Sequence, residues 1–167
     1  LLNGSHYSNY PPLNQLCFTI AALFSGNNII GSVLVFRIII VLADLGILFF
    51  GKKLLAYFNL NPNTIFLYFL NPFIIIELTG NLHFEGVMIC LLLMGIYFLK
   101  QNKLILSSFF IAASIALKLL PLLFLPLFFQ LLNFKKLVLF YSLILGFTLL
   151  FFIPFIDSAF LANYTKT

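Results

Sequence analysis

The chain has 167 residues, of which 63% are hydrophobic and only 8% are charged, with nine Lys or Arg against four Asp or Glu. A soluble domain carries about 25% charged residues, and a chain with a mean hydropathy of +1.16 lacks the polar surface that would cover a water-soluble globule. The composition excludes an ordinary soluble protein. It predicts an all-α, multi-pass transmembrane bundle, because helices satisfy their own backbone hydrogen bonds in lipid.

The net charge of +5 does not form a nucleic-acid patch. Most of the basic residues occur as three pairs, each directly after an apolar run: Lys52 and Lys53, Lys100 and Lys103, and Lys135 and Lys136. Cytoplasmic loops of membrane proteins carry the excess of Lys and Arg. These pairs therefore mark the cytoplasmic side of a lipid bilayer, and we expect no nucleic-acid partner.

We expect residues 1–167 to form one membrane-embedded helical domain. The sequence begins at Leu1 without a charged leader and a cleavage site, so we interpret it as an internal fragment of a longer chain. Cys17 and Cys90 both lie in apolar surroundings, which is typical of buried thiols rather than of a disulfide or a metal site.

In chain order, 1–12 is expected to be an external segment, and 13–26 is too short to span and is expected to lie half-embedded at the interface. A spanning helix needs roughly 20 apolar residues. Runs of this kind, bounded by Lys, Asn, Pro or Gly, predict membrane segments at 29–50, 63–78, 84–99 and 137–156.

With the lysine pairs on the cytoplasmic side, 29–50 and 84–99 run inward and 63–78 runs outward. The turn between the last two then lies outside. Segment 104–132 carries lysines near both of its ends and contains Pro121 and Pro126. We therefore expect it to be broken or re-entrant, with Lys118 at its outer apex.

Two ionisable residues fall within the first predicted span, where each costs about 2.5 to 3.5 kcal/mol on insertion scales. Arg37 and Asp44 are two helical turns apart, which places them on one face about 10 Å apart along the axis. We interpret Asp44 as part of a structural polar stripe that packs against neighbouring helices.

Polar residues are densest in the external turn, which holds Glu77, Asn81, His83 and Glu85. A carboxylate and an imidazole there could act as a general base or bind sugar hydroxyls. The alternative is a solvated turn that needs polar residues for no other reason. The spacing predicts no metal site, although two acids beside a histidine could hold a divalent cation weakly.

Lys118 stands between two leucines, and no acid lies near it in the sequence. An anionic ligand would supply the missing charge, and a lipid-linked phosphate at the membrane surface fits, because lysine binds phosphate as a point charge. Simple snorkelling of its long side chain to the headgroups is the alternative. Tyr10, before Pro11 and Pro12, is either an interfacial anchor or part of a carbohydrate platform.

Five sequence elements occur in order: Asn9-Tyr10-Pro11-Pro12-Leu13, Arg37 with Leu42-Ala43-Asp44, Leu70-Asn71-Pro72, Gly80-Asn81-Leu82-His83-Phe84-Glu85-Gly86, and Ala116-Leu117-Lys118-Leu119-Leu120-Pro121. As a series they resemble the multi-pass glycosyltransferases that use polyprenyl-phosphate sugars. Tyr-Pro-Pro-Leu, Arg with Ala-Asp, and Gly-x-x-His-Phe are similar to elements of dolichyl-phosphate-glucose glucosyltransferases. Lys-x-x-Pro is similar to the mannosyltransferase that starts the glycosylphosphatidylinositol core and to bacterial polyprenyl-phosphate-mannose enzymes.

This resemblance implies a GT-C architecture in the bacterial inner membrane or the endoplasmic reticulum. The enzyme would move a hexose, mannose by the Lys-x-x-Pro similarity, from the lipid-phosphate donor to a glycan or lipid acceptor on the external or lumenal face. It would require no cofactor beyond this donor substrate.

The resemblance also implies roles for individual residues. Lys118 and Arg37 would bind the donor phosphate. The sugar or acceptor would be bound by Tyr10, Glu77, Asn81, His83 and Glu85. The catalytic Asp of such enzymes lies in an external loop upstream of Tyr-Pro-Pro, and residues 1–8 contain no acid, so we expect it before this sequence.

A non-catalytic membrane subunit or a transporter fragment is the alternative from a different class of protein. Arg37 and Asp44 would then line a path through the membrane. Transporters usually show repeated halves around a midplane site, and we find no second half that matches the first.

Overall fold

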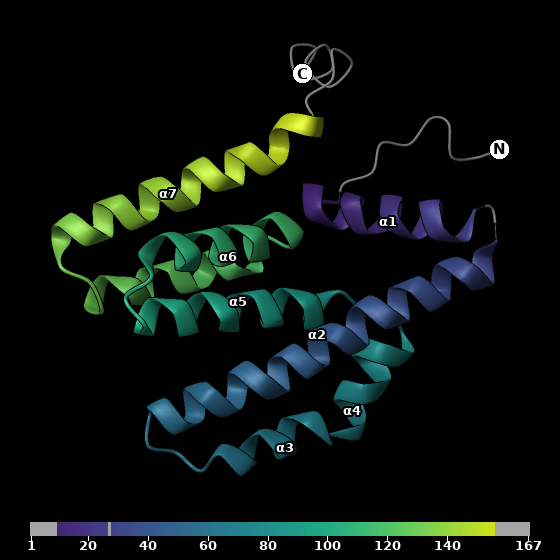
Figure 1. Ribbon diagram of the computed structural model, residues 1–167, viewed down its shortest axis with the longest axis horizontal. Helices are drawn as coiled ribbons and strands as arrows, with labels where there is room; N and C mark the ends of the chain where they lie inside the picture. The colour runs from purple at the N-terminus through teal and green to yellow at the C-terminus, as the bar shows by residue number, and fades with distance from the viewer. Residues whose placement is uncertain (1–9, 27, 156–167) are drawn as a thin grey trace.

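The computed structural model describes residues 10–26 and 28–155, and every regular element in these ranges is helical. The chain order (Figure 1) is α1 (Pro12–Ser25), α2 (Ile29–Tyr57), η2 (Pro62–Thr64), α3 (Ile65–Phe69), α4 (Pro72–Ile74), η3 (Ile75–Gly80), α5 (Glu85–Lys100), α6 (Leu104–Leu117), η4 (Leu120–Gln130), α7 (Phe134–Phe152) and η5 (Ile153–Phe155). The all-α prediction is confirmed. The described residues do not include most of the expected external segment 1–12. They also do not include residue 156, the last residue of the expected span 137–156.

Side chains before the two longest helices fix where these helices begin. Asn28 accepts hydrogen bonds from the backbone N–H groups of Ile30 and Gly31 at the start of α2. Asn133 accepts one from the N–H of Lys136 at the start of α7. Asparagine is a favoured N-cap because its side-chain oxygen satisfies N–H groups that have no partner within the helix.

Helix α2 continues to Tyr57, seven residues past the predicted end of the span at 50. The lysines expected to end it are accommodated on its surface. The ammonium of Lys53 lies 4.0 Å from the centre of the Phe49 ring, and that of Lys52 lies 4.7 Å from the centre of the Phe66 ring. A lysine stem can follow an apolar helix while its charge reaches a ring or water, so lysine does not stop a helix as proline does.

The segment predicted as one helix at 63–78 is divided in two. Its halves, Pro62–Phe69 and Pro72–Gly80, meet at an angle of 55°. Pro72 has no N–H to donate, which breaks the first helix, and the Asn71 side chain accepts a hydrogen bond from the N–H of Phe73 and so caps the second. The second half continues as the π-helix η3.

Helices α5, α6 and α7 pack around the largest buried cluster, in which Ile111 and Phe140 are fully buried. At the α5–α6 contact Gly95 faces Ile111, and Ser107 Oγ donates a hydrogen bond to the carbonyl of Gly95 at 2.7 Å. After α6 the chain turns at Lys118 and returns as the 3-10 helix η4. Segment 104–132 therefore has a break near its middle.

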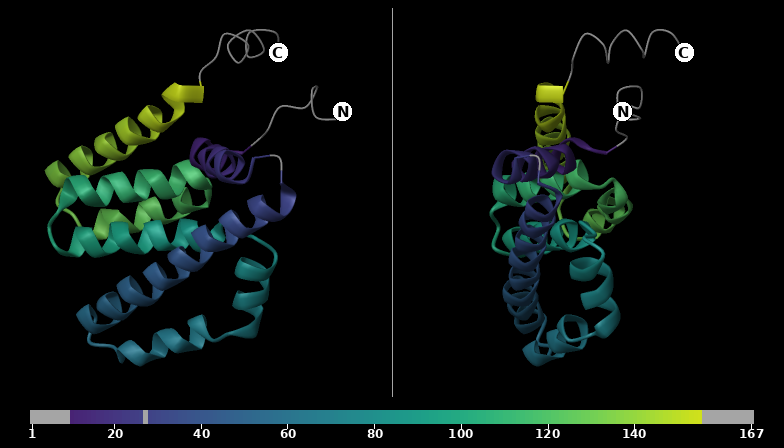
Figure 2. Two further views of the ribbon diagram at one scale, coloured as in Figure 1. Left: turned by 45° about the vertical axis from the view of Figure 1, so that its right-hand side comes forward. Right: turned by 90° about the vertical axis from the view of Figure 1, so that its right-hand side faces the viewer.

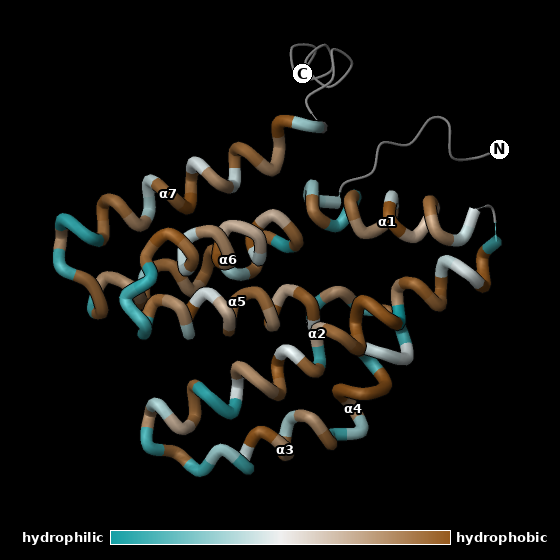
Figure 3. The backbone as a smooth tube through the Cα atoms, in the orientation of Figure 1, coloured by the Kyte–Doolittle hydropathy of each residue, from teal (hydrophilic) through white to brown (hydrophobic). Residues whose placement is uncertain are grey.

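The basic ends of the helices lie together. The Lys53 ammonium is 5.3 Å from the Tyr97 ring centre, and that of Lys100 is 5.6 Å from the Tyr57 ring centre. Helices α2 and α5 therefore run in the same direction. The α5–α6 and η4–α7 connections lie on this side too (Figures 1 and 2), and hydrophilic stretches gather at these connections (Figure 3).

Within the described ranges, α2 and α7 are long and apolar enough to cross a membrane, and the bent pair at 62–80 makes a third span if its halves count as one. Helix α5 has 16 residues and α6 has 14, so at 1.5 Å per residue they extend only about 24 and 21 Å, against about 30 Å of hydrocarbon. The chain thus has the helices of a membrane protein, and the number of its spans stays a prediction.

Candidate functional site

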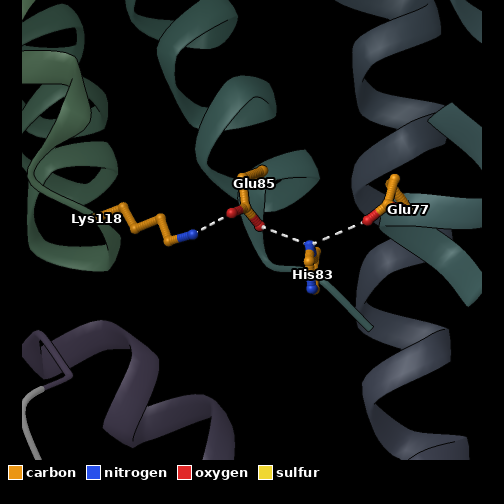
Figure 4. Close-up of polar contacts among 4 residues, drawn as sticks. All are labelled: Glu77, His83, Glu85 and Lys118. Atoms are coloured by element: carbon orange, nitrogen blue, oxygen red, sulfur yellow. Dashed lines mark hydrogen bonds and ion pairs between the residues drawn. The ribbon is translucent and has the colours of Figure 1, made fainter. Parts of the chain in front are cut away.

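Four ionisable side chains meet at the end of the bundle opposite the lysine pairs. Lys118 forms an ion pair with Glu85, the Nδ1 atom of His83 lies 3.9 Å from Glu85 Oε2, and the same Nδ1 lies 3.7 Å from Glu77 Oε2. Figure 4 shows these side chains as one continuous series from Lys118 to Glu77. We call this group the rim cluster.

Two antiparallel helices position the pair at the centre of the rim cluster. Glu85 lies in the first turn of α5, and Lys118 follows the last turn of α6. Ser114 Oγ donates a hydrogen bond to the carbonyl of Met88 at 2.8 Å, and Leu117 is buried against Phe84 and Met88. These contacts fix the end of α6 beside the start of α5, so the pair does not depend on a flexible loop.

The turn between η3 and α5 positions His83. Leu82 has a φ of +57°, and the backbone N–H of His83 donates to the carbonyl of Leu78 at 3.0 Å. Single turns of π-helix occur frequently at functional sites, and here the π-helix carries Glu77. The imidazole consequently lies between two carboxylates.

The prediction that Lys118 lacks a nearby acid is wrong, because Glu85 neutralises it from 33 residues away. An ammonium has three N–H donors, and one of them is directed to Glu85 Oε1. The Lys118 side chain is 36% exposed and that of His83 is 51% exposed. The rim cluster is therefore accessible, and Lys118 keeps donors for a second anion.

A group of aromatic rings packs beside the rim cluster, at Phe84, which directly precedes Glu85. Phe18 of α1 contacts Phe36 of α2 and Phe84, with ring centres 5.7 and 6.1 Å apart, and all three rings meet edge to face. The half-exposed ring of Tyr10 packs on Phe18 at 5.4 Å. Tyr10 thus joins the same region through its contact with Phe18.

Three other residues that the sequence analysis named lie outside the ion pairs of the rim cluster. Arg37 is exposed on α2 and forms no ion pair with an acid among residues 10–26 and 28–155. Asn81 is exposed in the turn, and its backbone N–H donates to the carbonyl of Ile76. Asp44 accepts a hydrogen bond from Thr79 Oγ1 at 3.1 Å instead of pairing with Arg37.

Sequence reasoning missed Thr79 and Tyr68, which line a pocket together with Asp44. The only signal was the position of Thr79 in the polar turn, because 35 residues separate it from Asp44. No three His, Cys, Asp or Glu side chains gather as metal ligands in the part of the chain that the structure describes.

Comparison with known proteins shows which family the sequence matches. A family model described as "Alpha-(1->6)-mannopyranosyltransferase, N-terminal domain" matches residues 5–133. The matched range includes every residue of the rim cluster. Searches of curated proteins and of solved structures found no match to the chain.

Proposed function

Since the chain belongs to the alpha-(1->6)-mannopyranosyltransferase family, we propose that the protein transfers mannose from a polyprenyl-phosphate donor to the O6 hydroxyl of an acceptor sugar, at the rim cluster. The family supports the transferred sugar and the linkage. It also favours an enzyme over a transporter fragment or a non-catalytic subunit. The apolar helices support a lipid-linked donor. A protein embedded in the bilayer can receive a sugar from a carrier that is dissolved in the same bilayer.

The observation that carries the proposal is the convergence of Lys118 with Glu85, His83 and Glu77. The leaving group of a polyprenyl-phosphate sugar is an anion, and fixed charges stabilise such a group most strongly where water is scarce. Lys118 directs its free N–H donors to the donor phosphate. Glu85 holds the ammonium in place, so little reorganisation is needed when the charge develops.

The remaining groups suit a sugar. Carboxylates accept hydrogen bonds from hydroxyls, and an imidazole both donates and accepts them. Glu77 and His83 lie together and are partly exposed, so they bind hydroxyls of the donor mannose or the acceptor. Tyr10, which precedes α1, and Asn81, in the turn before His83, are further candidates for contacts to the sugar or the acceptor. Arg37 is not needed for this arrangement.

The reaction is a single displacement at the anomeric carbon. The bond from that carbon to the acceptor oxygen forms as the bond to the phosphate oxygen breaks, and the proton of the acceptor hydroxyl passes to a base. The sequence resemblance assigns this base to an Asp before Tyr10. A single displacement inverts the anomeric carbon, so an alpha-linked product requires a donor in which mannose is beta-linked to phosphate.

We infer that the rim cluster lies on the non-cytoplasmic side of the membrane, because the lysine pairs lie at the opposite end of the bundle and cytoplasmic loops carry the excess of Lys and Arg. The lumenal or periplasmic leaflet is then where donor and acceptor meet. A glycan or a lipid-linked glycan that presents a primary hydroxyl at this surface is the acceptor class that the linkage requires.

Transfer assays with the full-length protein in liposomes test this proposal. We expect label from polyprenyl-phosphate β-mannose to appear in an alpha-(1->6) product. We expect about tenfold less transfer from the α-anomer, from polyprenyl-phosphate glucose and from GDP-mannose. Efficient direct use of GDP-mannose would contradict the lipid-linked donor, and efficient use of the glucose donor would contradict the choice of mannose.

A further inference from the structure

Two lysines and two tyrosines contact one another where α2 and α5 end. The Lys53 ammonium of α2 lies 5.3 Å from the centre of the Tyr97 ring of α5, and the Lys100 ammonium of α5 lies 5.6 Å from the centre of the Tyr57 ring of α2. Tyr57 follows Lys53 by about one helical turn, and Tyr97 precedes Lys100 by about one turn. Both ammonium groups therefore lie in the seam between the two helices, and we call these four residues the seam site.

The positive charge of the seam site is not neutralised by any acid that the structure describes. Every ion pair of the described residues belongs to the rim cluster, at the other end of α5. The attraction of an ammonium to an aromatic ring is weaker than a charge-assisted hydrogen bond to an oxygen anion. An ammonium also has three N–H donors, so Lys53 and Lys100 both keep donors for an anionic ligand.

The hydroxyl of Tyr97 adds a third donor group to the seam site. It accepts a hydrogen bond from Nε2 of Gln101 at 2.6 Å, which leaves its own O–H to donate. A phosphate group fits two ammonium groups and a phenol O–H, because its oxygens accept hydrogen bonds and carry negative charge. The seam site has no carboxylate for a positively charged headgroup, so a phosphate that is linked to choline or ethanolamine fits less well.

An exposed apolar stripe of α2 leads to the seam site. Four apolar side chains recur at intervals of three or four residues and are each at least half exposed: Ile38, Leu42, Leu45 and Phe49. This spacing places them on one face of the helix. The stripe ends at the ring of Phe49, whose centre is 4.0 Å from the Lys53 ammonium. From Ile38 to Lys53 the helix rises about 22 Å, which exceeds the about 15 Å of hydrocarbon in one leaflet.

We propose that the seam site binds the phosphate of an anionic phospholipid, whose headgroup carries no positive charge, and that an acyl chain of this lipid lies along the stripe of α2. A free phosphate would use the same donors but would gain nothing from the stripe, so the two features together favour a lipid. Basic residues at the ends of membrane helices attract anionic lipids in general. The seam site adds to this attraction two ammonium groups from different helices and a hydroxyl between them.

Native mass spectrometry of the full-length protein in a neutral detergent tests this site. The probes are dioleoyl phosphatidylglycerol and dioleoyl phosphatidylcholine, which have the same chains and different headgroups. We expect the first phosphatidylglycerol to bind at least about tenfold more tightly than the first phosphatidylcholine, because each lysine near an anionic headgroup contributes about a factor of five. Equal affinity for the two lipids would overturn the proposal.

A competitor without acyl chains distinguishes a lipid from a free phosphate. We expect glycerol 3-phosphate, at the concentration that saturates the site with phosphatidylglycerol, to leave the bound lipid in place, because it makes no contact with the stripe of α2. Displacement of the lipid at this concentration would show that the site recognises the phosphate alone, and would overturn the assignment to a lipid.

A matched pair of double variants locates the effect. Lys53→Gln with Lys100→Gln removes both ammonium groups of the seam site, whereas Lys135→Gln with Lys136→Gln removes two exposed lysines of α7 at the same end of the bundle. We expect the affinity for the first phosphatidylglycerol to fall at least about tenfold in the first variant and less than about twofold in the second. Equal losses would overturn the proposal, because they would show a general attraction to positive charge.

Tyr97→Phe provides a test that keeps both charges and the aromatic ring. This variant removes one O–H donor, and we expect the affinity for phosphatidylglycerol to fall at least about threefold while the affinity for phosphatidylcholine stays within about twofold. If the double variant of the seam site failed to fold, unchanged phosphatidylglycerol affinity in Tyr97→Phe would still overturn the proposal. The mannosyl-transfer assay does not enter this test, since the rim cluster lies at the other end of α5.

Discussion

Lys118, directly after α6, forms an ion pair with Glu85 in the first turn of α5, although 33 residues separate the two in the chain. The contact joins the carbonyl end of one helix to the N–H end of its antiparallel neighbour. A cation is favourable at the first of these ends and an anion at the second. Each charge of the pair is therefore stabilised by the helix end beside it as well as by its partner, and the pair fixes the position of the Lys118 ammonium at the rim cluster.

A double-mutant cycle with Lys118→Met and Glu85→Gln measures the strength of this pair. Both side chains are about one-third exposed, so water screens the attraction and we expect a coupling of only about 0.5 to 1 kcal/mol in the free energy of unfolding. Reversible unfolding in mixed micelles supplies the values. The control cycle combines Glu85→Gln with Lys135→Met, at an exposed position at the opposite end of the bundle, and a coupling no larger than in this control would refute the contact.

Gly95 sets the closeness of α5 and α6. A Cβ at this position would lie 2.5 Å from Ile111 Cγ1 and 3.3 Å from the backbone nitrogen of Ile111. We expect Gly95→Ala to destabilise the protein by roughly 1 to 3 kcal/mol, because the two helices must separate. The matched control is Gly146→Ala in α7, where a Cβ meets nothing within 4 Å and alanine should stabilise the helix by roughly 0.5 to 1 kcal/mol. Equal effects at both sites would contradict the packing.

Labelling with a membrane-impermeant maleimide tests which ends of the helices lie outside. In a variant with Cys17→Ser and Cys90→Ala, we expect Asn81→Cys to react from the non-cytoplasmic side and Gln101→Cys to react only after permeabilisation. Position 101 is preferable to 102, because Asn102 has a φ of +58° that disfavours cysteine. Reaction of both positions from one side would refute the proposed topology.

The native Cys17 is a poor reporter in such an experiment. Burial raises the pKa of its thiol, which leaves less thiolate at neutral pH. We expect wild-type protein to react with the maleimide more slowly than the Asn81→Cys variant at pH 7, and the difference to narrow as the pH rises. Equal rates for the two proteins at pH 7 would contradict the burial of this side chain.

We expect mannosyl transfer to continue in the presence of EDTA. Glu85 is engaged by Lys118, so the rim cluster keeps only Glu77 as a free carboxylate near His83, and a divalent cation normally needs more oxygen ligands than this. Transfer assays with EDTA, and with Mg²⁺ or Mn²⁺ added back, measure the dependence. Complete loss of transfer in EDTA with recovery by one of these metals would show that a cation participates.

The class of fold could be predicted from the sequence, because composition and long apolar runs depend on local properties alone. Helix ends were less predictable. Helix α2 continues beyond the predicted membrane segment 29–50, since lysines can lie along an apolar helix. The break at Asn71 and Pro72 divides a segment that hydropathy treats as continuous. Hydropathy averages over a window and does not register a single missing N–H.

Only those residues of the rim cluster that are close to one another in the sequence could be predicted to lie together. Glu77, His83 and Glu85 lie within nine residues of one another, so one turn brings them together. The partner of Lys118 and the hydrogen bond between Asp44 and Thr79 depend on how helices pack, over separations of 33 and 35 residues. No spacing rule within a single helix reports such contacts.

The measurement that tests the role of Lys118 most directly is mannosyl transfer from the lipid-phosphate donor by full-length protein carrying Lys118→Ala. The matched control is Lys103→Ala, an exposed lysine whose ammonium lies near Phe98 at the other end of α5. We expect kcat/KM to fall at least about tenfold in the first variant, with membrane insertion unchanged, and to stay near the wild-type value in the second. Wild-type transfer by the Lys118→Ala protein would show that this ammonium does not stabilise the departing phosphate.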